Sequence, residues 1–141
     1  MSFFRQNLFL IPVLAWIAAV VIKGIYFKYQ GKFTLSSALG SGGMPSVHSA
    51  LVTSLTTAVG IKYGVFSDLF IVCLVFSTII IYDAINVRFE AGLHARALNN
   101  LKCSKEEEAE YTFNESIGHL PEEAFVGSVV GILTAVILMS F

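Results

Sequence analysis

The segment SGGMPSVHS, from Ser41 to Ser49, brings a hydroxyl, an imidazole and two adjacent glycines close together. Pro45 suits the first turn of a helix, because its missing N–H is not needed there. Ser46 and His48 would then lie where free backbone N–H groups and the positive end of the helix dipole attract anions. Gly43 would let the backbone approach a ligand closely. The segment suits a phosphate, and it fits a plain helix cap with a hydrogen-bonded histidine equally well.

A second group lies in GHLPEEAFVG, from Gly118 to Gly127. Pro121 again marks a helix start and places Glu123 near the third helical position, from which a carboxylate reaches back toward the preceding residues. His119 lies four residues before Glu123. A carboxylate bonded to one imidazole nitrogen fixes the tautomer and makes the other nitrogen a better nucleophile or base. The alternative is ordinary helix capping beside an incidental histidine.

Other ionisable residues lie at the ends of apolar stretches. Lys23 ends the first stretch, and Asp83 and Arg88 end the third. An ionisable group costs about 2.5–3.5 kcal/mol at the centre of a membrane span and is rare there without a role. Single residues near a helix end can also snorkel to the surface independently. With four spans, these groups and both histidine motifs would lie at one membrane face, which favours shared chemistry.

The composition places these residues in a membrane protein. Of the 141 residues, 55% are apolar and 13% are charged, and the net charge is −1. This excludes a disordered chain and a basic nucleic-acid binder, and it argues against a water-soluble enzyme. We therefore expect membrane lipids and no nucleic acid as partners. Cys73 and Cys103 are too few for a disulfide framework and are expected to be plain thiols.

Four stretches are long or apolar enough to cross a bilayer, which requires about 20 mostly apolar residues. They cover about residues 8–27, 45–61, 69–87 and 121–141, and the second is the least apolar. The first is long for a cleaved signal peptide, so we expect a permanent span. The predicted fold is all-α: one domain over residues 1–141, built as a membrane-embedded bundle of four transmembrane helices.

The loop between the third and fourth spans contains a further helical pattern. Leu93, Ala97, Leu98 and Leu101 recur at helical spacing, which predicts an amphipathic loop helix over about residues 90–102. It would lie at the membrane surface or cap the bundle. The run KEEEAE that follows is read as a solvated turn or helix face.

The distribution of basic residues predicts the orientation. Two residues, Arg5 and Lys62, lie on one side, and the other side holds Lys23, Lys28, Lys32, Arg88, Arg96, Lys102 and Lys105. The positive-inside rule then places the first and third loops, and with them the polar groups, on the cytoplasmic side. We expect an integral protein of the cell membrane with both termini outside.

The combination of motifs resembles a known superfamily. MPSVHSA is similar to the PSxH motif of the type 2 phosphatidic acid phosphatases and vanadium haloperoxidases. His119 to Glu123, followed by Gly127, is similar to their HxxxD-xxx-G element, with Glu in place of Asp. GGMPSVHSA, YDAINVR, ALN and GHLPEEAFVG, in this order, resemble its small divergent branch of integral membrane proteins. The resemblance extends from about Asn7 to Gly131.

The resemblance implies a role for each matching residue. His119 would attack phosphorus and form a phosphohistidine, Glu123 would orient it, and His48 would protonate the leaving oxygen. Phosphate oxygens would be held by four residues: Lys23, Gly43, Ser46 and Arg88. Arg88 is the candidate guanidinium clamp, since Arg binds phosphate in a bidentate way. Asp83 would support the site by an ion pair with Lys23 or Arg88.

The sequence therefore predicts a membrane-embedded, metal-independent phosphatase for a lipid phosphate or pyrophosphate, with no cofactor. Two other readings stay open. One is a non-catalytic protein that binds phosphate or a lipid head group. The other is a small dimeric transporter, although transporters place their ionisable residues near the midplane. A homodimer through Gly127 and Gly131 is compatible with their small-xxx-small spacing, which usually reflects close helix packing.

Overall fold

The computed structural model describes residues 3–31, 40, 42–103 and 112–141, and the regular structure within these ranges is helical throughout. The all-α prediction is therefore confirmed. The helices are α1 (Phe3–Gln6), α2 (Leu10–Tyr29), α4 (Val47–Tyr63), α5 (Asp68–Ile85), α6 (Val87–Cys103) and α7 (Pro121–Ser140). The KEEEAE run and the side chains of Lys102 and Cys103 lie outside the described part.

Among the described residues, three helical stretches are long and apolar enough to cross a membrane: α2, α7 and the stretch from Asp68 to Leu101 that joins α5 to α6. Each stretch begins within two residues of the start of a predicted span. The helix at the predicted span 45–61 is α4, which has 17 residues. At about 1.5 Å per residue it is a few ångströms shorter than a hydrocarbon core of about 30 Å. A fourth full span therefore stays a prediction.

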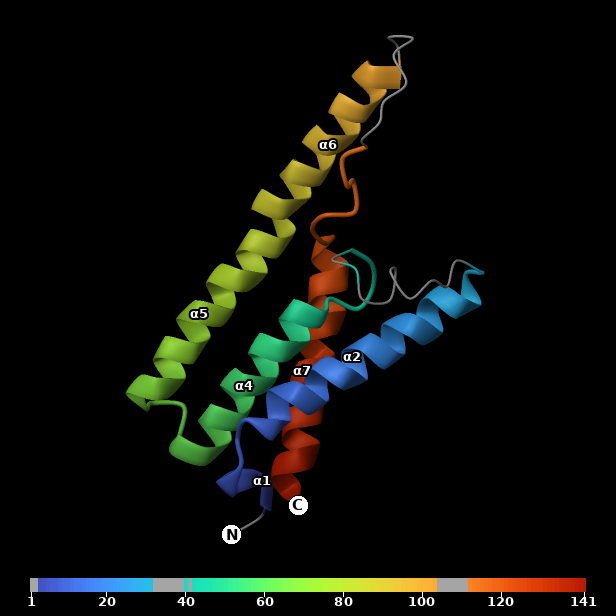
Figure 1. Cartoon of the computed structure of the whole chain (residues 1–141). Coiled ribbons are helices and arrows are strands. Elements are labelled where there is room, and N and C mark those ends of the chain that lie inside the picture. The colour runs from blue at the N-terminus through green and yellow to red at the C-terminus, as the bar shows by residue number, and fades with distance from the viewer. Residues whose placement is uncertain (1–2, 32–39, 41, 104–111) are drawn as a thin grey trace.

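Helix α4 lies at the centre of the bundle, with α2, α5 and α7 packed around it (Figure 1). Its buried side chains are small or carry hydroxyl groups, which explains why α4 is less apolar than α2, α5 and α7. They are Ser49, Ala50, Val52, Ser54, Thr56, Ala58 and Val59. Helix α5, in contrast, buries only Ser77 and Ala84, so that most of its apolar surface faces outward.

The closest contact in the bundle joins α4 and α7. Gly127 faces the backbone of Ser46, and Gly131 faces the carbonyl of Ala50 and the hydroxyl of Thr53, so closely that neither position has room for a Cβ atom. The small-xxx-small spacing therefore packs two helices of the same chain. The expected dimer contact through Gly127 and Gly131 is wrong for this reason, since α4 occupies that face.

Hydroxyl groups add hydrogen bonds between the helices. The Thr53 hydroxyl donates to the carbonyl of Ser128 on α7 (3.2 Å). The hydroxyls of Thr56 and Ser77 lie 2.7 Å apart, and Ser77 also donates to the carbonyl of Val52 (3.2 Å). In an apolar surrounding such bonds satisfy polar groups that lipid cannot satisfy. They tie α4 to both α5 and α7.

The helix starts at the two motifs differ in detail. Helix α7 begins at Pro121, as predicted. Helix α4 begins two residues after Pro45, and Ser46 is its N-cap, accepting the N–H of Ser49 (3.3 Å). Ser46 therefore precedes the first turn rather than lying within it, because its hydroxyl serves the free N–H groups of the helix.

Helix α6 confirms the predicted loop helix and starts three residues earlier than expected. It neither caps the bundle nor lies across its end: it continues the line of α5 beyond the bundle (Figure 1). Its inner face packs on the segment before α7, where Gly92 lies against the carbonyls of Glu115 and Ile117. Of the predicted apolar stripe, Leu93, Leu98 and Leu101 are exposed.

The α4–α7 contact yields a testable prediction. Gly131→Ala forces a methyl group against the α4 backbone and should lower the free energy of unfolding by about 1–3 kcal/mol. Circular dichroism of the detergent-solubilised protein during denaturation measures this change. Gly60→Ala is the matched control on α4, since its Cβ would meet only the side chains of Phe70 and Val65. Equal destabilisation by both substitutions would contradict the proposed tight packing.

Candidate phosphate site

The polar residues singled out in the sequence lie together at one end of the bundle. This end holds the starts of α4 and α7 and the junction of α5 with α6 (Figure 1). His48 lies on the first turn of α4, and His119 directly precedes α7. The charges of Lys23, Arg88 and His119 all act on His48. These polar residues therefore lie at the same end of the bundle.

His119 is held between the bundle and the α5–α6 junction. It is 2% exposed, and its backbone N–H donates to the carbonyl of Ala84 at the end of α5 (3.0 Å). Gly118, just before it, has φ +97°, and a Cβ there would collide with the backbone of Arg88 and Phe89. Only glycine adopts this conformation and this close approach without strain. The sequence motif thus positions His119 by a backbone contact.

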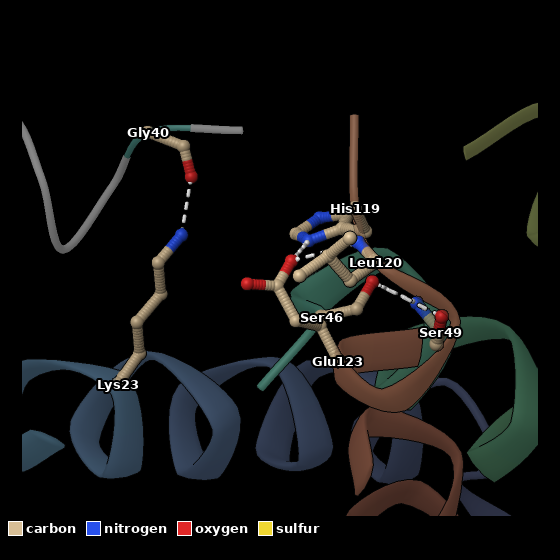
Figure 2. Close-up of polar contacts among 7 residues, drawn as sticks. All are labelled: Lys23, Gly40, Ser46, Ser49, His119, Leu120 and Glu123. Carbon is tan, nitrogen blue, oxygen red and sulfur yellow. Dashed lines mark hydrogen bonds and ion pairs between the residues drawn. The ribbon is translucent and has the colours of Figure 1, made fainter. Parts of the chain in front are cut away.

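Glu123 orients the His119 ring (Figure 2). Because an ionised carboxylate only accepts hydrogen bonds, Nδ1 of His119 donates to Oε2 of Glu123, at 3.0 Å. The same oxygen accepts the backbone N–H of Leu120 (3.1 Å), as a carboxylate at the third helical position can. Glu is long enough to do both, so its replacement of Asp in the motif preserves the contact with the ring.

The other imidazole nitrogen of His119, Nε2, is buried and has no hydrogen-bond partner within the described residues. An unpaired buried polar atom costs about 1–3 kcal/mol and calls for an explanation. The His48 ring lies near the His119 ring, with 6.5 Å between the ring centroids and 60° between the planes. With Nδ1 protonated, Nε2 carries a lone pair. Nε2 therefore has the lone pair that a nucleophile or a base requires, and a second imidazole is close by.

Lys23 brings a buried cation to this end of α2. Its side chain is fully buried, and Nζ donates to the carbonyl of Gly40 (2.5 Å; Figure 2). Its charge acts on both His48 and Glu123. A buried ammonium group is costly unless it is paired, and the carbonyl of Gly40 is the partner that Lys23 has here.

The PSVH segment offers fewer unpaired backbone N–H groups for an anion than the sequence suggested. The N–H of Ser46 donates to the carbonyl of Glu123 (3.0 Å), and its Oγ lies 3.0 Å from Oγ of Ser49. In this structure the Ser46 amide is therefore already paired and ties α4 to α7. Gly43 has φ +87°, and a Cβ there would strike the ring of Phe27. Glycine is required at this position by packing and backbone conformation.

Arg88 and Asp83 form an ion pair at the α5–α6 junction, with Nε and Oδ2 2.6 Å apart. Both side chains are partly exposed, Arg88 by 47% and Asp83 by 37%. Of the two cations expected beside Asp83, the structure pairs it with Arg88, while Lys23 bonds to Gly40. His94 and Arg96 lie exposed on α6, away from this pair.

Two contributors to the site were not identified from the sequence: the Ala84 carbonyl and the close approach at Gly118. The adjacent pair Gly118–His119 was a usable signal, because a glycine next to a functional residue often marks a tight backbone contact. Within the described ranges, no three His, Cys, Asp or Glu side chains come together in a way that could hold a metal ion.

The site combines an oriented imidazole, a second imidazole and two cations at the end of an apolar bundle. The sequence model of the Divergent PAP2 family matches residues 4–134. The chain belongs to this family. The match includes every candidate site residue, from Lys23 to Glu123.

A relative of similar length is also described as a membrane protein. The chain is 34% identical to the "Uncharacterized membrane protein YuiD" of Bacillus subtilis (strain 168), over 92% of this chain and 94% of the relative. No solved structure matches the chain. Together with the apolar helices, these findings identify a membrane protein of the Divergent PAP2 family.

The Glu123 contact predicts the tautomer of His119. At a pH where the ring is neutral, the proton should lie on Nδ1, and ¹⁵N chemical shifts of the histidine-labelled protein in detergent measure this. Glu123→Ala removes the acceptor and should distribute the proton over both nitrogens. Glu122→Ala, the exposed neighbour, is the control and should keep the wild-type tautomer. An unchanged tautomer in Glu123→Ala would refute the orienting role.

Proposed function

We propose that this protein is a membrane-embedded phosphatase that hydrolyses a lipid phosphate or pyrophosphate through a phosphohistidine at His119. The observation that carries the proposal is the buried, unpartnered Nε2 of His119, oriented through Nδ1 by Glu123 and placed beside His48. Membership in the Divergent PAP2 family supports the same chemistry.

The reaction has two steps in this proposal. The Nε2 lone pair of His119 attacks phosphorus, and the bond from phosphorus to the leaving oxygen breaks while the His48 imidazolium donates a proton to that oxygen. Water then attacks the phosphohistidine, and neutral His48 accepts the water proton. The P–N bond breaks, and inorganic phosphate and free His119 result. Glu123 stabilises the positive charge on His119 during the first step.

The chain's own cations can offset the charge on the phosphoryl oxygens. Lys23 is buried, and its charge acts on Glu123 and His48, while Arg88 acts on His48 from the α5–α6 junction. Preorganised cations in a site of low dielectric stabilise developing negative charge without further reorganisation. On this basis the proposed reaction uses no metal ion and no cofactor.

A lipid substrate fits the position of the site. The site lies at the end of apolar helices, and exposed apolar side chains, such as Leu120 and Phe125, surround the start of α7. An amphiphile could place its phosphate at the site and keep its tail in the bilayer. The basic residues of the first and third loops support a cytoplasmic site in the cell membrane.

The central test is His119→Ala. The variant should lose release of inorganic phosphate from dioctanoyl phosphatidic acid by at least about a thousandfold, because no other group replaces the nucleophile. The assay uses purified protein in detergent with a metal chelator present. His94→Ala, on the exposed face of α6, is the matched control and should keep wild-type activity.

Full activity of His119→Ala would refute the phosphohistidine mechanism. If the wild-type protein binds orthovanadate but releases no phosphate from phosphatidic acid or a polyprenyl pyrophosphate, the chain is a phosphate or head-group binding protein instead. Orthovanadate is a suitable probe for this second outcome because it is a tetrahedral oxyanion like phosphate.

His48 should matter most where the leaving oxygen needs a proton. His48→Ala should lower kcat/KM for an alkyl phosphate by about 10²–10⁴, the range expected for a lost general acid. In a phosphate ester of a nitrophenol with an equally long tail, the leaving group departs as a stable phenolate and needs no proton. For this ester His48→Ala should lower kcat/KM far less. Comparing the two esters in wild type and variant provides the measurement. Equal losses for both esters would assign His48 to phosphate binding rather than to proton transfer.

A further inference from the structure

The Asp83–Arg88 pair joins two positions that do not face each other on a regular helix. Residues five apart point in directions about 140° apart, whereas partners three or four apart are neighbours. The 2.6 Å contact is possible because the helix is interrupted: α5 ends at Ile85, and Asn86 has φ −115° and ψ −79° before α6 begins. The interruption at Asn86 therefore turns Arg88 toward Asp83.

The same junction is fixed to the segment that carries His119. The N–H of His119 bonds to the carbonyl of Ala84, one residue after Asp83. Gly118 lies against the backbone of Arg88 and Phe89. The segment that carries His119 therefore contacts the α5–α6 backbone on both sides of the interruption, directly beside Asp83 and at Arg88.

The ion pair leaves most of the Arg88 guanidinium unoccupied. It uses Nε–H, one of five N–H donors, and within the described residues Arg88 makes no other hydrogen bond. With Nε paired to Asp83, the edge formed by its two terminal nitrogens can still bind a phosphate in a bidentate way. Asp83 precedes Ala84, whose carbonyl accepts the His119 N–H, and the Arg88 backbone lies against Gly118, so the pair lies close to His119.

Stability alone does not account for the pair. Both side chains are partly exposed, and ion pairs of this kind contribute little to the free energy of folding. A long, flexible Arg side chain, however, loses much rotamer freedom when it binds a phosphate. A carboxylate that fixes Nε in advance removes part of this loss and favours binding.

We propose that Asp83 is a positioning residue, which holds Nε of Arg88 across the interruption at Asn86 and so presents the terminal nitrogens of Arg88 to the phosphate group. This inference rests on the proposed function. Asp83 itself touches neither the substrate nor His119. Its carboxylate acts through Arg88, and its charge also balances that of the guanidinium while the site is empty.

The test is a double-mutant cycle on Asp83 and Arg88. Asp83→Ala should raise the dissociation constant of orthovanadate and lower kcat/KM for dioctanoyl phosphatidic acid, each by about tenfold, a typical size for coupled neighbours. In the Arg88→Ala background the same substitution should change neither value. Asp83→Asn keeps the shape and one acceptor oxygen, so it should lie between wild type and Asp83→Ala.

Asp68→Ala is the matched control, because Asp68 lies on the same helix at the opposite end. It should change neither vanadate binding nor kcat/KM. The melting temperature separates positioning from structural support: the inference expects Asp83→Ala to melt within a few degrees of wild type. A large loss of melting temperature that Asp83→Asn shares, or equal effects of Asp83→Ala with and without Arg88, would overturn the inference.

The two proposals fail in different ways. If wild type releases phosphate and the cycle shows no coupling, the positioning role is wrong and the proposed function stands. If wild type binds vanadate without turnover, the cycle on the dissociation constant still decides the positioning role. If wild type neither binds vanadate nor releases phosphate, both proposals are wrong.

Discussion

The contact between Ser46 and the first turns of α7 fixes the geometry of the candidate site. The N–H of Ser46 donates to the carbonyl of Glu123. The backbone of Ser46 also lies directly against Gly127, which has no side chain to separate the two helices. Ser46 is also the N-cap of α4, two residues before His48. Because Glu123 holds the His119 ring, one backbone contact determines how the two imidazoles approach each other.

Local features of the site could be predicted from the sequence, and distant ones could not. The start of α7 at Pro121 and the reach of Glu123 back toward His119 depend on neighbours within four residues. The direction of α6 depends on two dihedral angles at Asn86, which no pattern in the sequence encodes. Likewise, the spacing of Gly127 and Gly131 predicts a close helix contact but does not say which helix makes it.

Polar groups are tolerated in this apolar bundle because of where they lie. Lys23 and His119 are both buried, but they lie near the ends of helices, where carbonyl oxygens and backbone N–H groups are available. The interior of the bundle carries hydroxyl groups instead, and these bond to neighbouring carbonyls. The buried ionisable side chains Lys23 and His119 therefore lie toward one end of the bundle, and the buried polar groups between the helices are hydroxyls that hydrogen bonds satisfy.

The central position of α4 also bears on how the chain enters the bilayer during synthesis. Alone in lipid, α4 would present Ser49, Ser54 and Thr56 to hydrocarbon, and insertion of such a segment is far less favourable than that of α2 or α5. Its partners arrive at different times. Ser77 follows within the next helix, whereas the carbonyl of Ser128 is translated near the end. We therefore expect α4 to settle fully in the bilayer only once α7 is available to pack against it.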